Sequence, residues 1–200
     1  MRTAQLPTLV LLSLALGSAC SSKVPSVTGM VAAPPASCLP GERGYLRVGL
    51  RGAMERDLDW SGALLQCEGG ARPEGRGLRV SFSSVAPGAG TKLRIVFGIA
   101  AAPGANRSVN LPTNITVIVE GGNRLYATQG DDKCQVESLV QQPLEGAPGE
   151  HAYRIAARGY CIDPATTLDG SRRLYINRFD FAGVARFEAL DLHASTAGPG

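Results

Sequence analysis

Short apolar runs that alternate with polar residues constrain this chain most. Residues 92–99 read Lys-Leu-Arg-Ile-Val-Phe-Gly-Ile, and residues 78–83 read Leu-Arg-Val-Ser-Phe-Ser. Successive side chains of a β-strand point to opposite faces, so this period of two predicts strands with one apolar face. Residues 115–120 alternate less strictly, which predicts a strand buried on both faces. No stretch shows the 3.6-residue apolar period of a surface helix.

Clusters of turn-forming residues separate the apolar runs. Gly121-Gly122-Asn123 precedes a strand expected over 124–128, and glycine and asparagine tolerate the positive φ of a hairpin turn. Other strands are expected over 45–50, 58–67, 134–140, 152–161, 174–181 and 185–190. Eight to ten short strands predict an all-β chain, most simply an antiparallel two-sheet sandwich of jelly-roll type. A closed β-barrel is the alternative.

The chain has an odd number of cysteines: Cys20, Cys38, Cys67, Cys134 and Cys161. In an exported protein an odd count leaves one thiol to be explained. If Cys20 is set apart, the other four can pair in three ways. The wide gap in the middle favours the local pairs Cys38–Cys67 and Cys134–Cys161, each worth about 3.5 kcal/mol in the chain-entropy model. Metal binding by these cysteines is the weaker reading, because no C-x-x-C spacing occurs.

The first nineteen residues have the pattern of a signal peptide. Arg2 is followed by the apolar run 9–16 and by the small residues 17–19. The run is too short to span a bilayer as a helix, which takes about 20 apolar residues. We therefore expect residues 1–19 to be removed on export, to an oxidising compartment.

Residues 16–20, Leu-Gly-Ser-Ala-Cys, resemble the lipobox of bacterial lipoproteins. The sequence departs from that motif at Gly17, where Leu, Val or Ile is usual. The resemblance implies that Cys20 carries a diacylglyceryl group and an acylated amino terminus, which anchor the protein to a membrane. Ser21, in place of Asp, then implies the outer membrane. The alternative is ordinary secretion with cleavage at the same bond, which leaves Cys20 as a free thiol.

The remaining chain divides into a spacer, a domain and a tail. Residues 20–37 are rich in Pro, Ser and Ala and are expected to form a flexible linker. Residues 38–193 are expected to form the β-sandwich, and residues 194–200 a disordered tail. The formal charge of +3, or +2 without Arg2, is too small to indicate nucleic acid as a partner.

The sequence offers little for catalysis. His151 and His193 are the only histidines, and none of the common hydrolase, metalloprotease or nucleotide-binding motifs is present. Asp131-Asp132 precedes Lys133, which opposes a bound cation, and Glu120 with Asp132 is one arbitrary carboxylate pair among many. We therefore expect no enzyme, no cofactor and no metal.

Aromatic residues are the candidates for ligand binding. Trp60, the sole tryptophan, lies on an expected strand and could form a sugar-binding platform with Tyr126 or Tyr175. A place in the core is the plainer reading for Trp60. Arg172-Arg173 could contact an anionic glycan or lipid headgroup, or simply be solvated.

These features predict a non-enzymatic cell-envelope lipoprotein that binds or assembles with a glycan or an envelope protein. The alternative is a tethered or secreted hydrolase that acts on glycan or cell-wall polymer. A cleft with His151 or a converging carboxylate pair would favour the hydrolase. A flat aromatic or arginine-lined patch would favour the binding module.

Overall fold

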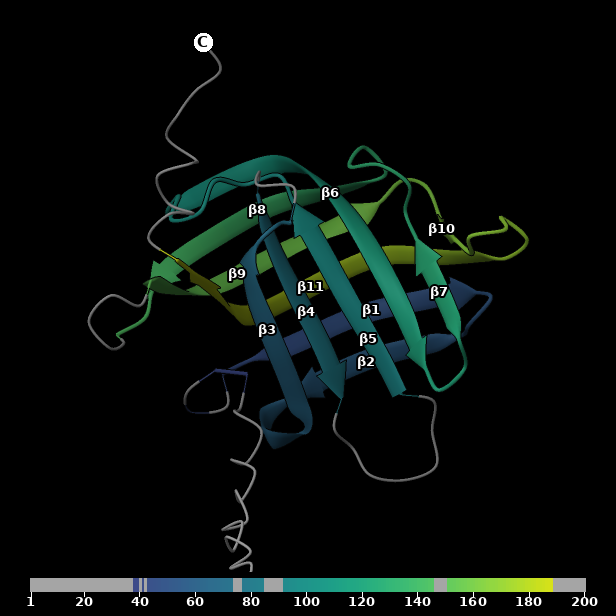
Figure 1. The fold of residues 1–200 in the computed structure, drawn as a ribbon, viewed down its shortest axis with the longest axis horizontal. Coiled ribbons are helices and arrows are strands. Elements are labelled where there is room, and N and C mark those ends of the chain that lie inside the picture. Colours follow the sequence, from purple (N-terminus) through teal and green to yellow (C-terminus); the bar gives the residue numbers. More distant parts are fainter. Residues whose placement is uncertain are drawn as a thin grey trace, which may run out of the picture. The chain divides into compact units, whose positions relative to one another are not determined.

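Antiparallel β-strands make up nearly all of the regular structure in the computed structural model (Figure 1). It describes residues 38–39, 41, 43–73, 77–84, 92–145 and 151–188, which belong to one compact unit. The strands are β1 (Tyr45–Gly52), β2 (Arg56–Ser61), β3 (Leu65–Ala71), β4 (Leu78–Ser84), β5 (Lys92–Ile99), β6 (Arg107–Glu120), β7 (Arg124–Ala127), β8 (Cys134–Pro143), β9 (His151–Cys161), β10 (Ala165–Thr166) and β11 (Arg173–Phe187). The all-β prediction is confirmed.

The strands form two layers that share β6. In the front layer of Figure 1, β3, β4, β5, the second half of β6 and β7 lie side by side. In the back layer, β2, β1, β11, β9 and β8 follow in order, and β8 pairs with the first half of β6. The front strands cross β1 and β11 at a steep angle (Figure 1), as in orthogonally packed sandwiches. The strand path begins at β2 and ends at β3, so the sheet is not a clean barrel.

Three expected strand boundaries were wrong. The strand expected over 58–67 is two strands, because Gly62, with φ +63°, starts the short 3-10 segment η2 (Gly62–Leu64) between β2 and β3. The strands expected over 174–181 and 185–190 are a single strand, β11. Its pairing with β9 continues without a break through the small residues 182–183. Strand β6 begins eight residues earlier than expected, at Arg107 rather than Ile115.

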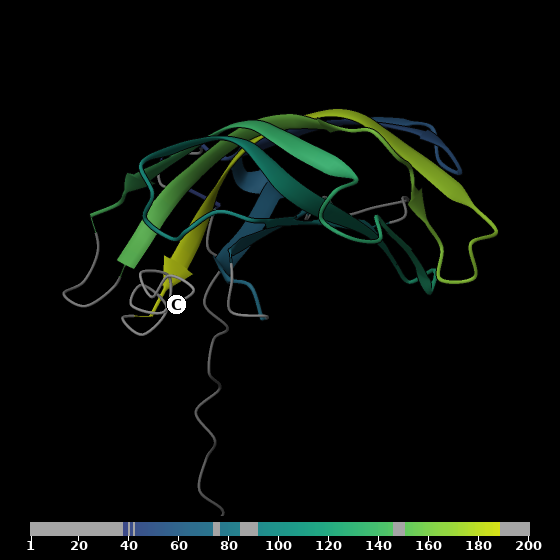
Figure 2. The same ribbon diagram turned by 90° about the horizontal axis from the view of Figure 1, so that it is seen from above.

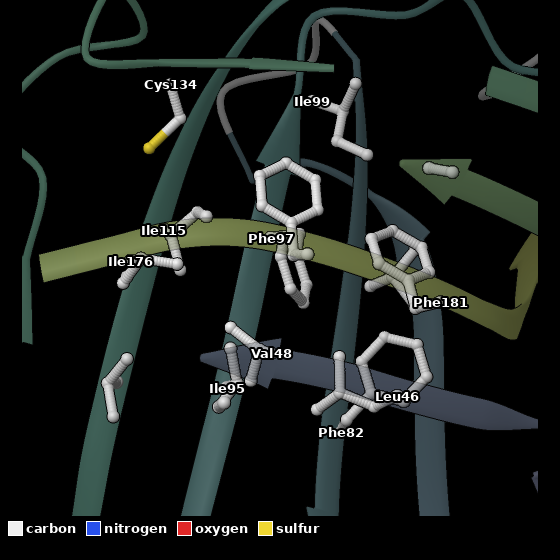
Figure 3. Packing of buried hydrophobic residues seen from close by; sticks show 14 of the residues in the cluster. Leu46, Val48, Phe82, Ile95, Phe97, Ile99, Ile115, Cys134, Ile176 and Phe181 are labelled. Atoms are coloured by element: carbon white, nitrogen blue, oxygen red, sulfur yellow. The ribbon is translucent and has the colours of Figure 1, made fainter. Parts of the chain in front are cut away.

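Phenylalanines fill the space between the layers. Phe82 and Phe97 of the front layer lie close to Phe181 of β11 (Figure 3). Phe179, also on β11, belongs to the same cluster. The ring centroids of Phe97 and Phe181 are 4.5 Å apart, and those of Phe82 and Phe181 are 5.0 Å apart. Such pairs add about 0.5–1.5 kcal/mol each to the stabilisation from apolar burial. The alternation that predicted the strands therefore also identified their inward faces.

Two disulfides, Cys38–Cys67 and Cys134–Cys161, join the pairs expected from the sequence. Cys134 and Cys161 face each other across β8 and β9. Cys67 lies on β3, and its bridge fastens the segment that precedes β1. Leu39, beside Cys38, is buried in a small cluster with Ala182 and Val184. The start of the described domain is thus held to β3 and to β11.

Candidate functional site

A row of irregular backbone crosses the back layer. In the β8–β9 pairing Glu137 is an extra residue, and in the β1–β11 pairing the register shifts at Gly49. Asn110 of β6, opposite Glu137, has a φ of +54°. Bulges bend a strand and re-aim its side chains, and they are common beside functional sites. In Figure 2, β11 and the strands beside it are seen to curve into an arch.

Strand pairing places the two bulges at one level of the sheet. Val136, next to the first bulge, pairs with Gly159 of β9. Gly159 pairs with Phe179 of β11, and Phe179 pairs with Val48, next to Gly49. The irregular positions therefore form a line across the strands rather than isolated defects.

Two shallow hollows lie over this line, on the side of the back layer that faces away from the core. One, of about 470 Å³, extends from β2 to β8, and the other, of about 480 Å³, extends from β6 to β11. Both are lined by Glu137, Arg158 and Asp180. We refer to the two hollows together as the outer groove.

Charges of alternating sign run across the middle of the outer groove. In the strand register, Asp59 of β2 lies opposite Arg47 of β1, and Arg47 lies opposite Asp180 of β11. On its other side, Asp180 lies opposite Arg158 of β9. Opposite charges on facing strands stabilise an exposed sheet face. Among these facing charges of the described strands, only Arg47 and Asp59 lie within ion-pair distance, at 3.4 Å.

The carboxylates of the groove each have a partner. Asp57 accepts two hydrogen bonds from Arg51, at 2.7 and 3.0 Å. The Nε of Arg47 is 3.4 Å from Asp59, and the Nη1 of Arg178 is 4.0 Å from Glu137.

Asp180 is held by a tyrosine. The hydroxyl of Tyr45 donates a hydrogen bond of 2.8 Å to Asp180 Oδ1. Burial, and secondly this hydrogen bond, raise the pKa of Tyr45 above its usual value. The guanidinium of Arg47 lies 5.0 Å from the centre of the Tyr45 ring. This end of the groove is therefore fixed by contacts within the domain.

The β6 end of the groove is different, because it combines arginines with an apolar floor. Val109 is 59% exposed, and Val140 and Ala156 beside it are half-buried. Arg107 and Arg158 are exposed on either side of this floor and form no ion pair or side-chain hydrogen bond with the residues that the structure describes. This end offers apolar contact and two uncommitted guanidinium groups.

The three aromatic candidates do not form one platform. Trp60 is half-buried against the core, and Tyr126 is fully buried between the layers. The Tyr126 hydroxyl has no hydrogen-bond partner among the described residues. Tyr175 is 45% exposed on β11. Only Tyr175 presents substantial surface, and it lies outside the two hollows of the outer groove.

The acidic candidates are engaged in contacts within the domain. Asp131 accepts from Arg72 Nη1 at 2.9 Å and from Asn114 Nδ2 at 2.6 Å. Asp132 pairs with Lys133. The hydrogen bond from Lys92, and further contacts with Arg94, lower the pKa of Glu120. No group of three or more metal-ligating side chains occurs in the described ranges.

The remaining candidates lie apart from the groove. His151 begins β9 opposite Phe187, and Cys20 and His193 lie outside the described residues. Arg172 lines a third hollow, between the β6–β7 turn and the loop that follows β10. Leu168, at the tip of that loop, is 86% exposed.

Sequence reasoning missed the groove arginines. Arg158 and Arg178 belong to the strands expected over 152–161 and 174–181, where alternation places them opposite the core-facing residues. Arg107 precedes the strand expected from residue 115, so no expected alternation included it. That signal could have identified a charged outer face. It could not have identified the bulges, because these depend on which strands pair.

Within the described ranges, the structure has no helix with the length and apolarity needed to cross a bilayer. No known protein family, curated protein or solved structure matches this chain. The outer groove is the candidate site on geometric grounds, because the line of bulges crosses it and because Arg107 and Arg158 have no ion-pair partner among the described residues.

Proposed function

We propose that this chain is a non-enzymatic cell-envelope lipoprotein that binds its ligand in the outer groove. The observation that carries the proposal is the coincidence of the two bulges with the groove and with side chains of complementary charge. A backbone distorted at one level across several strands is a feature that a purely solvated sheet face does not need.

The contacts of the groove carboxylates support ligand binding in this proposal. General acid–base catalysis uses groups that are poised to exchange protons with a substrate. Here Asp57, Asp59 and Asp180 each have a cation or a hydroxyl as partner, and the bonds hold them in place. His151 lies at the far end of β9, outside the groove. This arrangement favours the binding module over the hydrolase.

The cysteine count supports the lipid anchor in this proposal. The two disulfides use four of the five cysteines, so Cys20 is the only one left for another role. An acylated Cys20 would place the domain at the outer membrane on a linker of residues 20–37. The domain would then search for its ligand close to the envelope surface.

The experiment that tests this proposal measures how much of the protein, without its lipid anchor, sediments with washed envelope material. A chain of residues 20–200 with Cys20→Ser lacks both the signal and the site of lipidation, and Val109→Trp adds a bulky side chain to the groove floor. We expect the Cys20→Ser protein to sediment with washed envelope material and the Cys20→Ser, Val109→Trp protein to remain soluble. Leu64→Trp is the matched control, since Leu64 is 54% exposed and lies outside the groove. Equal retention of the Val109→Trp and Leu64→Trp proteins would refute the proposal.

A further inference from the structure

The β6 end of the outer groove carries positive charge that the domain itself does not use. Asp57 and Asp59, at the β2 end, are held by Arg51 and Arg47, and Asp180, which lines both hollows, is held by Tyr45. Arg107 and Arg158, in contrast, have no such partner among the described residues. Exposed guanidinium groups are common on protein surfaces, so a binding role for these two has to be argued from their positions in the groove.

The two arginines flank the apolar floor at a defined spacing. Arg107 pairs with Val140, and Val140 pairs with Ala156, two residues before Arg158. Two strand separations and two residues of rise place their Cα atoms about 12 Å apart. Ser138 and Val140 of β8 lie between them, and Val109 lies opposite Ser138 on β6. The strands hold this spacing, and each side chain can still turn toward a ligand.

This geometry suits a particular chemistry. Guanidinium binds carboxylate and phosphate through two parallel hydrogen bonds. An apolar floor favours a ligand with C–H surfaces between its charged groups. A polysaccharide with oxyanions on successive or alternate sugars has both features, whereas an isolated small anion has only one.

We infer that the β6 end of the outer groove binds an anionic polysaccharide, whose carboxylate or phosphate groups are held by Arg107 and Arg158. This inference rests on the proposed function and names the class of ligand. Two carboxylates, Glu137 and Asp180, line the same hollow, and each has a partner of its own. Glu137 is 4.0 Å from Arg178, and Asp180 accepts a hydrogen bond from Tyr45.

The test measures binding of defined oligosaccharides to the Cys20→Ser chain of residues 20–200 by titration calorimetry. The probes are oligogalacturonate, phosphorylated oligomannose and unphosphorylated oligomannose. We expect at least one anionic probe to bind, and the neutral oligomannose to bind at least tenfold more weakly. The tighter of the two anionic probes identifies the oxyanion as carboxylate or phosphate.

Variants decide whether the two arginines are responsible. Arg107→Gln with Arg158→Gln should weaken binding of the anionic probe roughly tenfold or more, since each loses a charge-assisted hydrogen bond. Arg124→Gln with Arg172→Gln removes the same charge from the third hollow and should change affinity less than twofold. The lysine pair Arg107→Lys with Arg158→Lys should recover only part of the affinity, because lysine lacks the planar fork.

Three results would overturn the inference: no binding of either anionic probe, equal binding of the neutral probe, or equal losses in the two glutamine variants. These results are separable from failure of the proposed function. If the envelope still retains the Cys20→Ser chain through a Val109-dependent contact, the groove binds a ligand of another class. If retention is also absent, the proposed function fails as well.

Discussion

Single carboxylates in this domain are held by local hydrogen bonds, and Asp169 is the clearest case. It lies in the loop between β10 and β11 and accepts hydrogen bonds from the hydroxyls of Thr167 and Ser171 and from the Ser171 amide. The Thr167 bond first, and then the Ser171 bonds, lower the pKa of Asp169 from 3.8 to about 2. The side chain organises the loop that presents Leu168.

The lowered pKa of Asp169 makes the stability of the folded protein depend on pH. The folded-state value lies below the unfolded value, so the carboxylate contributes stability above about pH 4 and loses it as the pH falls through about 2. A carboxyl-detected NMR titration should show an Asp169 midpoint near 2. Thr167→Val with Ser171→Ala should move the midpoint toward 3.8, and Ser108→Ala, on β6, should leave it unchanged. A wild-type midpoint near 3.8 would show that the loop bonds do not form in solution.

At the scale of strands, the bulge line depends on close backbone contact at Gly159. A Cβ placed on Gly159 would collide with the carbonyl oxygen of Gln135 and lie 2.5 Å from the ring of Phe179. Gly49, at the other bulge, has room, since its nearest atom would be Asp57 Oδ1 at 3.4 Å. The two glycines thus lie at one level but have different steric demands.

Alanine substitutions should separate these two glycines. Gly159→Ala should lower the free energy of unfolding by about 1–3 kcal/mol, the usual cost of overpacking a rigid site. Gly49→Ala should change it by less than about 1 kcal/mol, because the neighbouring atom belongs to a side chain that can turn away. Urea unfolding of both variants measures the difference. Equal stabilities would mean that β8 and β9 do not approach as closely as described.

Strands were predictable where one face is buried, and bulges were not. The alternation over 92–99 located β5 at its observed bounds, because each inward side chain packs on the opposite layer. Strand β10 has two residues, too few for any period to show. The register shifts at Glu137 and Gly49 arise between strands that are distant in sequence, so no local pattern could indicate them.

In the candidate site, too, features set by local sequence could be predicted, and features set by strand pairing could not. The pairs Cys38–Cys67 and Cys134–Cys161 were predicted correctly because each joins cysteines close in sequence. The aromatic residues were selected by type, and folding placed Tyr126 in the core and Tyr175 on the surface. The groove gathers residues from β6, β8, β9 and β11, so only the assembled sheet could bring them together.

At the scale of the whole molecule, the tether is a chemical prediction. Intact mass of protein extracted from its native membrane should correspond to a chain that begins at Cys20 and carries the acyl groups of a lipoprotein. Alkylation before reduction should modify no thiol, and alkylation after reduction should modify Cys38, Cys67, Cys134 and Cys161. A chain that begins at Cys20 without lipid, or with an alkylatable Cys20 before reduction, would refute the anchor and leave a secreted protein.

The most direct test of the central claim is whether the outer groove is covered in the envelope. The substitutions Val109→Cys and Leu64→Cys each introduce one thiol into the full chain. A membrane-impermeant maleimide can label that thiol. We expect both positions to be labelled in purified protein and position 109 alone to become protected in washed native envelopes. Equal labelling of the two positions in the envelope would show an empty groove and would contradict the claim that the groove holds the ligand.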